Sequence, residues 1–240
     1  MKIAILADVH ANLEALEAVL IAVERERADR IFCLGDIVGY GPDPLGCIYR
    51  LKEAEVQTVL GNHDQAIVEP SHIQSFNRLA RPSLYHAREV LGEGEIYYLS
   101  RASLRRVEFN AVFAHANPLK PEDWEPLHMY DKIMWCFERL DWSLCFVGHT
   151  HEAGIYCKLH NRPLPLTSTT VAIGAHQYLI NVGSVGQPRD GDWRASFALW
   201  DLDRQYVELQ RVEYPIQRTQ RKMAEYDFPI YLTERLARGE

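Results

Sequence analysis

Two histidines one residue apart, His149 and His151 in the tetrapeptide GHTH, directly follow the apolar run LCFV at 144–147. In an extended chain successive side chains alternate between faces, so the two imidazoles would share a face if the strand geometry continued. Such a pair can chelate a metal ion, whereas the same residues in a surface turn would be ordinary hydrogen-bonding groups. The tetrapeptide alone leaves both interpretations open.

The same alternate spacing recurs at Asp8 and His10, directly after the apolar run IAIL at 3–6. Other apolar runs also end next to a side chain that can bind a metal, namely Asp36 after 30–34, Asn62 after 56–60 and His115 after 111–114. Open α/β sheets place their ligand crevice at the carboxyl ends of the strands. We therefore expect all of these groups to meet at one rim.

The residue types at these strand ends indicate which ions they would bind. Carboxylates and imidazoles together suit divalent ions such as Mn, Fe, Ni, Co or Zn. Gly35, Gly61 and Gly148 each precede a candidate ligand, and glycine permits tight turns and close backbone approach. Glycine is also ordinary punctuation at the end of a strand. The sequence predicts a metal centre without fixing the identity of its ions.

Taken in chain order, the motifs D-x-H, G-D-x-x-G, G-N-H-D, a single H and G-H-x-H resemble the signature set of the calcineurin-like metallophosphoesterase superfamily. They lie at 8–10, 35–39, 61–64, 115 and 148–151. The resemblance implies an α/β fold, a four-layer α/β/β/α sandwich in which two mixed β-sheets are flanked by helices. It also implies two divalent ions at the strand ends.

The resemblance assigns the ligands residue by residue, with one carboxylate shared between the ions. Asp36 would bind both ions. The other ligands of the first ion would be Asp8, His10 and His151, and those of the second would be Asn62, His115 and His149. Two ions about 3.5–4 Å apart can share a water, lower its pKa and clamp the phosphate oxygens during hydrolysis. We therefore expect attack by a hydroxide that bridges the metals.

Three further groups of residues are candidates for contact with substrate. His63 would act as general acid or charged donor to the phosphate, with Asp64 fixing its tautomer and raising its basicity; a purely structural His63 is the alternative. Asn12 could touch the substrate phosphate or only cap the following helix. Arg189, in the glycine-rich segment 181–190, could line the phosphate pocket or lie in a plain loop.

Tyr40 narrows the expected substrate. Protein phosphatases and symmetrical dinucleoside tetraphosphate hydrolases of the superfamily carry an arginine at this place, and usually Glu where this chain has Asp64. Arginine grips phosphate through two N–H groups, which tyrosine cannot do. The chain is more similar to the small prokaryotic phosphodiesterases, so we predict hydrolysis of phosphodiester bonds in small or nucleotide-type substrates. A phosphomonoesterase, a protein phosphatase and a non-catalytic metal-binding scaffold are the alternatives.

Short β-branched apolar runs, typical of buried strands, would position these groups. Between the first two runs, within 12–28, Leu13, Leu16, Leu20 and Val23 recur at helical spacing behind Asn12 as a possible cap. Segments at 154–159, 169–173, 195–202 and 206–214 indicate antiparallel strands. Residues 65–109 form a polar insertion that is too long for a plain loop, and we expect it to be helical and to cover part of the molecule as a cap. After Pro215 we expect a helix that is broken at Pro229. We predict a single domain over 1–240.

The net charge limits the classes of partner, and the cysteines indicate the cellular compartment. A net charge of −7 argues against long nucleic acid and anionic membranes, so the expected partner is a small phosphoester, with a homo-oligomer left open. The five cysteines have no CxxC spacing and suit reduced, packed thiols in the cytoplasm. The apolar stretch before Asp8 is too short for a signal peptide.

Overall fold

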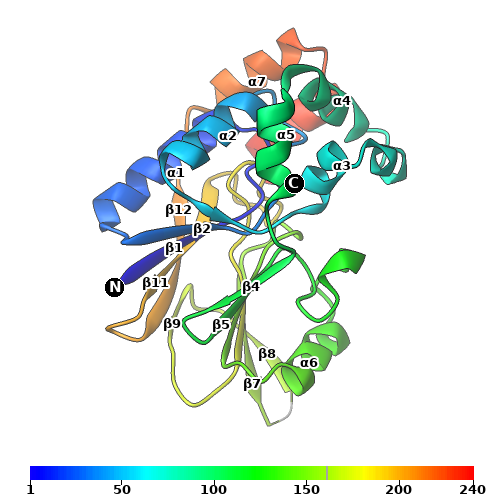
Figure 1. Ribbon diagram of the computed structural model, residues 1–240. Coiled ribbons are helices and arrows are strands. Elements are labelled where there is room, and N and C mark those ends of the chain that lie inside the picture. Colours follow the sequence, from blue (N-terminus) through cyan, green and yellow to red (C-terminus); the bar gives the residue numbers. More distant parts are fainter. Residues whose placement is uncertain (161) are drawn as a thin grey trace.

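The computed structural model describes residues 1–160 and 162–240, whose strands form two sheets (Figure 1). The first sheet contains β1 (Lys2–Leu6), β2 (Arg30–Cys33), β3 (Gln57–Thr58), β9 (Thr170–Ala172), β11 (Ala195–Asp201) and β12 (Tyr206–Val212). The second contains β4 (Arg105–Glu108), β5 (Ala111–Ala114), β6 (Leu144–Val147), β7 (Gly154–Leu159), β8 (Arg162–Leu166) and β10 (Tyr178–Asn181).

Both sheets mix parallel and antiparallel neighbours. The strand orders are β3-β2-β1-β11-β12-β9 and β4-β5-β6-β10-β7-β8. β1 pairs parallel with β2 and antiparallel with β11, and β10 pairs parallel with β6 and antiparallel with β7. The predicted antiparallel pairing of the later strands is confirmed for β11 with β12 and for β12 with β9.

Helices cover the outer faces of the sheets. They are α1 (Leu13–Glu26), α2 (Pro44–Glu53), α3 (Asn62–Val68), α4 (Arg81–Val90), α5 (Glu93–Ser100), α6 (Tyr130–Arg139), α7 (Ile216–Glu225) and α8 (Ile230–Arg235), with the short 3-10 helices η1 (Pro70–Ser75), η2 (Pro121–Asp123) and η3 (Leu236–Arg238). In Figure 1, α1, α2 and α7 lie over the first sheet, and α6 lies beside the second.

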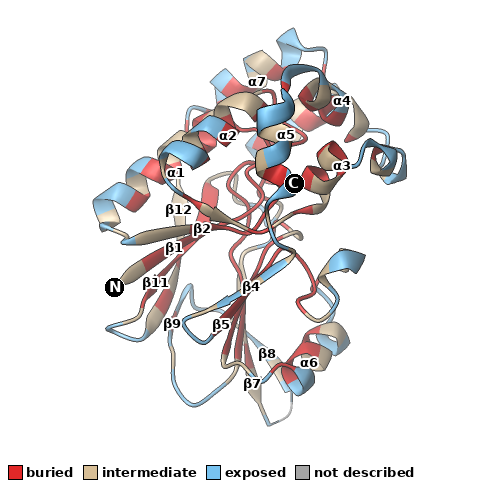
Figure 2. Ribbon diagram, in the orientation of Figure 1, coloured by how far each residue is buried: buried red, intermediate tan, exposed pale blue. Residues whose placement is uncertain are grey.

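Alternation of side chains along the strands separates three hydrophobic cores. In β1, Leu6 points into the core shared with the helices over the first sheet, whereas Ile5 points into the core between the sheets. In β6, Phe146 joins the core between the sheets, whereas Cys145 packs in the core with α6. Figure 2 shows β1 as buried along most of its length, and β6 is buried at all four residues. Three cores between successive layers confirm the predicted four-layer α/β/β/α sandwich.

The helix predicted within 12–28 is α1, which spans Leu13–Glu26, and Asn12 caps it. The Asn12 Oδ1 atom accepts a hydrogen bond from the backbone N–H of Ala15 at 3.2 Å, which satisfies one of the free amides of the first turn. Arg27 ends the helix in a left-handed conformation. The predicted C-terminal break also occurs, since α7 and α8 lie on either side of Pro229.

The 65–109 segment is helical over most of its length, as α3, η1, α4 and α5. Its last residues contradict the helical prediction, because Arg105–Glu108 form β4 at the edge of the second sheet, antiparallel to β5. Residues Leu84, Ala87 and Leu99 pack into the same core as Leu6, so the segment extends the outer helical layer. Its role as a cap and the single domain over 1–240 stay predictions.

One further strand, β8, was not predicted. Its sequence RPLPL contains two prolines, which cannot donate to a ladder and which argue against a central strand. It lies at the edge of the second sheet, where it pairs with β7. No helix in 1–160 or 162–240 combines the length and the apolar composition needed to cross a bilayer.

Candidate metal centre

Every strand end predicted to carry a ligand delivers it to one edge of the sandwich. Asp8 follows β1, Asp36 follows β2, Asn62 begins α3 after β3, His115 follows β5, and His149 and His151 follow β6. Their ligand atoms, with His63, form groups whose members lie within 4.8 Å of one another: Asp8, His10 and His151; Asp36, His115 and His149; and His10, Asp36 and His63.

The backbone at this edge is not extended. His149 and His151 were expected to share a face because the strand would continue through them, and this strand geometry is not found. Asp8, His10 and Asp36 have φ of 54°, 48° and 52°, and His149 and His151 have φ of 68° and 63°. Non-glycine residues rarely adopt this left-handed region, and they do so mostly where the surrounding structure imposes it. His149 and His151 therefore reach the centre from a strained turn after β6 rather than from a continued strand.

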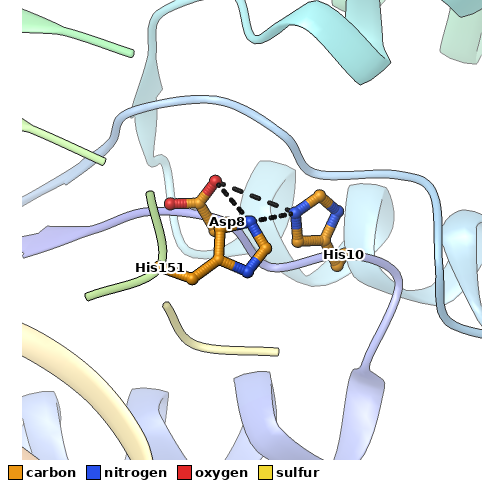
Figure 3. A group of neighbouring side chains, drawn as sticks. All are labelled: Asp8, His10 and His151. Atoms are coloured by element: carbon orange, nitrogen blue, oxygen red, sulfur yellow. Dashed lines mark hydrogen bonds and ion pairs between the residues drawn. The ribbon is translucent and has the colours of Figure 1, made fainter. Parts of the chain in front are cut away.

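Asp8, His10 and His151 form the first cluster (Figure 3). The Asp8 Oδ1 atom lies 3.7 Å from His10 Nε2 and 3.4 Å from His151 Nε2. The two Nε2 atoms lie 3.0 Å apart. Asp8 Oδ1 is buried and has no hydrogen-bond partner among the described residues. A buried carboxylate oxygen without a donor is costly, so this atom is suited to a cation.

The tautomers of His10 and His151 support the same conclusion. His10 Nδ1 lies 3.1 Å from the Val38 carbonyl and His151 Nδ1 lies 2.6 Å from the Gln187 carbonyl. Because a carbonyl only accepts, each Nδ1 donates, and the facing Nε2 atoms carry lone pairs in the neutral rings. Neutral imidazole nitrogens of this kind are metal ligands, so His10 and His151 could hold one ion together with Asp8.

Asp36, His115 and His149 form the second cluster, with Asn62 beside it. His115 Nδ1 lies 2.8 Å from the Leu34 carbonyl, which directs Nε2 into the centre. That Nε2 atom lies 3.4 Å from Asp36 Oδ2, 3.1 Å from Asn62 Oδ1 and 3.0 Å from His149 Nδ1. Oxygen and nitrogen ligand atoms thus converge in this cluster as they do in the first.

Asp36 links the two clusters. Its Oδ2 atom lies 3.4 Å from His115 Nε2 on one side and 3.7 Å from His10 Nε2 on the other. Its Oδ1 atom accepts a hydrogen bond from the backbone N–H of His63 at 2.8 Å, which orients the carboxylate. Asp36 is the carboxylate that contacts histidines of both clusters through one oxygen, as a bridging ligand would.

Two glycines allow the ligand-bearing loops to touch. A Cβ on Gly61 would lie 2.2 Å from the backbone nitrogen and Oδ1 of Asp36, and one on Gly148 would lie 2.6 Å from Asp8 Oδ2. The next backbone amide after Gly148, that of His149, donates to the same Asp8 oxygen at 2.9 Å. The close approach expected from the sequence is confirmed at both positions.

Burial and charge set the protonation of the ligands. Burial lowers the pKa of His10 and of His151 well below the usual range, and that of His149 to about 3, so these rings are neutral near pH 7. Burial raises the pKa of Asp8 to about 7. Burial also acts to lower the pKa of His115, but the neighbouring Asp36 carboxylate outweighs it and raises that pKa to about 9. The neutral imidazoles and buried carboxylates fit divalent cations.

The model of the calcineurin-like phosphoesterase superfamily domain matches residues 1–205 of the chain. The chain belongs to this superfamily. Membership implies a metal-dependent hydrolase of phosphate esters, in agreement with the His and Asp clusters at the sheet edge.

Three relatives match nearly the whole length of this phosphoesterase. An uncharacterized protein of Methanocaldococcus jannaschii is 36% identical over 243 residues, covering 99% of this chain and 98% of the relative. The crystal structure of a metallophosphoesterase from Sphaerobacter thermophilus is 37% identical, with a TM-score of 0.88 and coverage of 100% of both chains. A hypothetical protein from Pyrococcus horikoshii OT3 shares the fold, with 20% identity, a TM-score of 0.83 and coverage of 100% and 98%.

His63 lies beside the metal clusters of this phosphoesterase, with its Nε2 4.0 Å from Asp36 Oδ2. Its ring packs against the rings of His10, Tyr40 and Phe76 at centroid distances of 4.8, 4.7 and 4.6 Å. A Cβ on Gly39 would lie 2.1 Å from His63 Nδ1, so this glycine leaves room for the ring. Burial lowers the pKa of His63 to about 4, which makes it a neutral donor rather than a charged one near pH 7.

The prediction that Asp64 contacts the His63 ring and fixes its tautomer is wrong. The Asp64 carboxylate accepts hydrogen bonds from the backbone N–H groups of Ile37 at 2.9 Å, Val38 at 3.3 Å and Gly61 at 3.2 Å. Consecutive residues in a helix point in different directions, so Asp64 cannot face its neighbour's ring within α3. Its observed contacts are with the loop after Asp36 and with the start of α3, not with His63.

The possible contact of Asn12 with substrate is also not supported. Both of its side-chain polar atoms are engaged, Oδ1 by the amide of Ala15 and the hydroxyl of Thr219, and Nδ2 by the Gly186 carbonyl and the Tyr214 hydroxyl. The residue is 1% exposed. Asn12 caps α1 and ties it to the C-terminal part of the chain.

Arg189 lies beside the centre, over the Tyr40 ring. Its guanidinium carbon is 5.4 Å from the centre of the Tyr40 ring, and its Nη2 donates to Gln187 Oε1 at 2.7 Å. Its charge adds to the lowering of the pKa of His151 and of His63. The sequence did not single out Gln187, whose carbonyl orients His151, or Phe76, which packs on His63, because neither residue belongs to a local motif.

Proposed function

We propose that the protein hydrolyses phosphodiester bonds in small or nucleotide-type substrates, using two divalent metal ions. The observation that carries this proposal is the position of Asp36 between the two ligand clusters. The first ion would be held by Asp8, His10, Asp36 and His151, the second by Asp36, Asn62, His115 and His149. When bound, such ions lower the pKa of a coordinated water and polarise the phosphoryl oxygens.

The remaining residues would orient and stabilise the phosphate. His63 Nε2 faces the centre from the side of Asp36, and we propose that it donates a hydrogen bond to a phosphate oxygen as charge accumulates there. Arg189 would attract the anionic substrate to the centre and pair with a second oxygen. Asp64 would act through the backbone, by holding the amides that follow Asp36.

Tyr40 favours a diester over a monoester. Its ring is buried to 8% exposure and packs between His10 and His63, so an apolar surface lies where related enzymes place an arginine. A monoester carries up to two negative charges on its phosphate, whereas a diester carries one. With Tyr40 in place of an arginine, the guanidinium next to the centre is that of Arg189. One such positive charge suits the single negative charge of a diester better than the two charges of a monoester.

The test is an assay of the metal-free protein reloaded separately with Mn, Fe, Ni, Co or Zn. We expect bis(p-nitrophenyl) phosphate to be cleaved faster than p-nitrophenyl phosphate with at least one ion, Mn first among them, and metal analysis to give about two ions per chain. Faster cleavage of the monoester would favour a phosphomonoesterase. Failure to cleave either ester with any ion would favour a non-catalytic scaffold.

We also propose a cytoplasmic location. Cys33, Cys47, Cys136, Cys145 and Cys157 are free and buried, as in proteins of reducing compartments. Burial raises the pKa of the Cys136 thiol to about 12, which keeps it protonated and unreactive. A small phosphoester as partner agrees with the acidic net charge of −7.

A further inference from the structure

A cavity of ≈ 240 Å³ adjoins the second metal cluster and is lined by Asn62, Gln65, His72, Ser75, Phe76 and Trp124. We propose that it binds a flat heteroaromatic group of the substrate, of the nucleobase class, while the phosphate lies at the metal centre. The proposal rests on the proposed phosphoesterase function and adds the part of the substrate that is recognised outside the phosphate.

The position of the cavity connects it to the reaction site. Asn62 belongs both to its wall and to the second metal cluster, where its Oδ1 lies 3.1 Å from His115 Nε2. Asn62 and His149 are the partly exposed ligands, so the centre opens toward this side. If the phosphate lies at the second cluster, the organic group esterified to it would extend into the adjoining cavity.

Two aromatic rings wall the cavity, and each is braced by a histidine of the centre. The Phe76 ring lies 4.6 Å from the His63 ring at an interplanar angle of 71°, and the Trp124 ring lies 5.8 Å from the His115 ring, also at 71°. Both aromatic residues are only partly buried, so they keep surface for a ligand. Stacking between a base and an aromatic side chain accepts any base, because every base has a π face.

Polar atoms at the edge of the cavity distinguish a heteroaromatic base from a plain hydrocarbon. Trp124 Nε1 donates to Gln65 Oε1 at 2.8 Å, which fixes the indole, and Gln65 itself belongs to the lining of the cavity. Ser75 and His72 add further polar groups to the lining. A base offers donors and acceptors along its edge, so it can pair with these groups where a lipid chain cannot.

The loop that carries Trp124 is held in a defined conformation. Trp124 has φ of 53°, an uncommon value for a bulky residue, and such strain is retained where surrounding contacts impose it. Asn117 imposes those contacts, since its backbone N–H donates to the Glu125 carbonyl at 3.1 Å and its side chain to Glu125 Oε2 at 2.8 Å. The indole is thereby preorganised before a ligand arrives, which lowers the entropic cost of binding.

The size of the cavity limits its occupant. Pockets that enclose drug-sized ligands measure about 300–1,000 Å³, and the present cavity of ≈ 240 Å³ is smaller. One ring system fits, with the sugar and the phosphate outside it. The expected substrates are therefore nucleotide esters that place one base in the cavity.

The experiment compares the binding of AMP and ribose 5-phosphate to the Mn-loaded protein by titration calorimetry, with recovery of intact ligand checked afterwards. We expect AMP to bind about tenfold more tightly, since the two ligands share the phosphate and sugar but differ in the base. Trp124→Ala and Phe76→Ala should each weaken the binding of AMP more than that of ribose 5-phosphate and so remove most of that difference. Trp124→Phe should retain most of it.

Trp135→Ala, on α6 outside the cavity, is the matched control and should bind AMP as the wild type does. Metal content and circular dichroism establish that each variant is folded, and Phe76→Ala carries the test if Trp124→Ala does not fold. Equal affinity of the wild type for AMP and ribose 5-phosphate would overturn the proposal, as would unchanged AMP binding in folded Phe76→Ala and Trp124→Ala. Absence of diester hydrolysis, by contrast, would overturn the proposed function alone, because binding is measured independently.

Discussion

The Nε2 atoms of His10 and His151 lie 3.0 Å apart, although 141 residues separate them in the chain. Each ring directs its Nδ1 to a backbone carbonyl, so the two facing nitrogens both carry lone pairs when the rings are neutral. Two lone pairs cannot form a hydrogen bond with each other, and both rings are buried. Asp8, His10 and His151 would hold a cation together, and its positive charge would stabilise the apposition of the two nitrogens.

Replacement of Asp36 by Asn tests the shared ligand. The amide keeps the hydrogen bond from the His63 backbone but removes the negative charge facing His10 and His115. We expect both ions to be lost together and diester hydrolysis to fall more than about 100-fold, as measured by elemental analysis and steady-state kinetics. Asp141→Asn, at an exposed position, is the control. Retention of two ions by Asp36→Asn would show that the carboxylate does not bridge.

Replacement of His63 by Ala separates phosphate stabilisation from metal binding. If His63 donates to the phosphate, kcat should fall by about 10²–10⁴-fold while the metal content stays that of the wild type. His63 also groups with His10 and Asp36 in the structure, so a loss of metal in this variant would identify it as a ligand instead. His128→Ala, which changes an exposed histidine, should leave both quantities unaltered.

Gly148→Ala tests the close approach of the loop after β6. The new methyl group would lie 2.6 Å from Ala7 Cβ and from Asp8 Oδ2, so Asp8 must move. We expect lower metal affinity and a loss of about 1–3 kcal/mol in the free energy of unfolding, measured by denaturant titration. Gly94→Ala is the matched control, since a Cβ there meets nothing within 4 Å. In α5 that substitution should stabilise by about 0.5–1 kcal/mol.

Metal affinity should increase with pH. In the metal-free protein the pKa of His115 is raised to about 9 by Asp36 and that of Asp8 to about 7 by burial, so both groups hold protons at pH values below these. Metal ligands must release their protons, so affinity should rise between about pH 6 and pH 9 and then level off. Calorimetric titration with Mn in buffers of different ionisation enthalpy should detect protons released at neutral pH. Affinity independent of pH over this range would contradict the assignment.

Much of the centre could be predicted from the sequence because its ligands follow strands. Asp8, Asp36, Asn62 and His115 each come directly after an apolar run, and the carboxyl ends of neighbouring strands share an edge of the sheet. The same local patterns predicted α1 and its Asn12 cap. What could not be predicted were the contacts of Asp64, the hydrogen bonds that occupy Asn12, and the edge strands β4 and β8.

The sequence by itself determined the residue types and the order in which the strand ends present them, because strand alternation, helical spacing and glycine turns depend on near neighbours in the chain. Only the tertiary structure decided which atoms meet. Asn12 and Thr219, for example, bond across 207 residues, and the walls Phe76 and Trp124 come from separate segments that carry no recognisable motif. Such contacts depend on how whole layers pack, and no local pattern of residues encodes them.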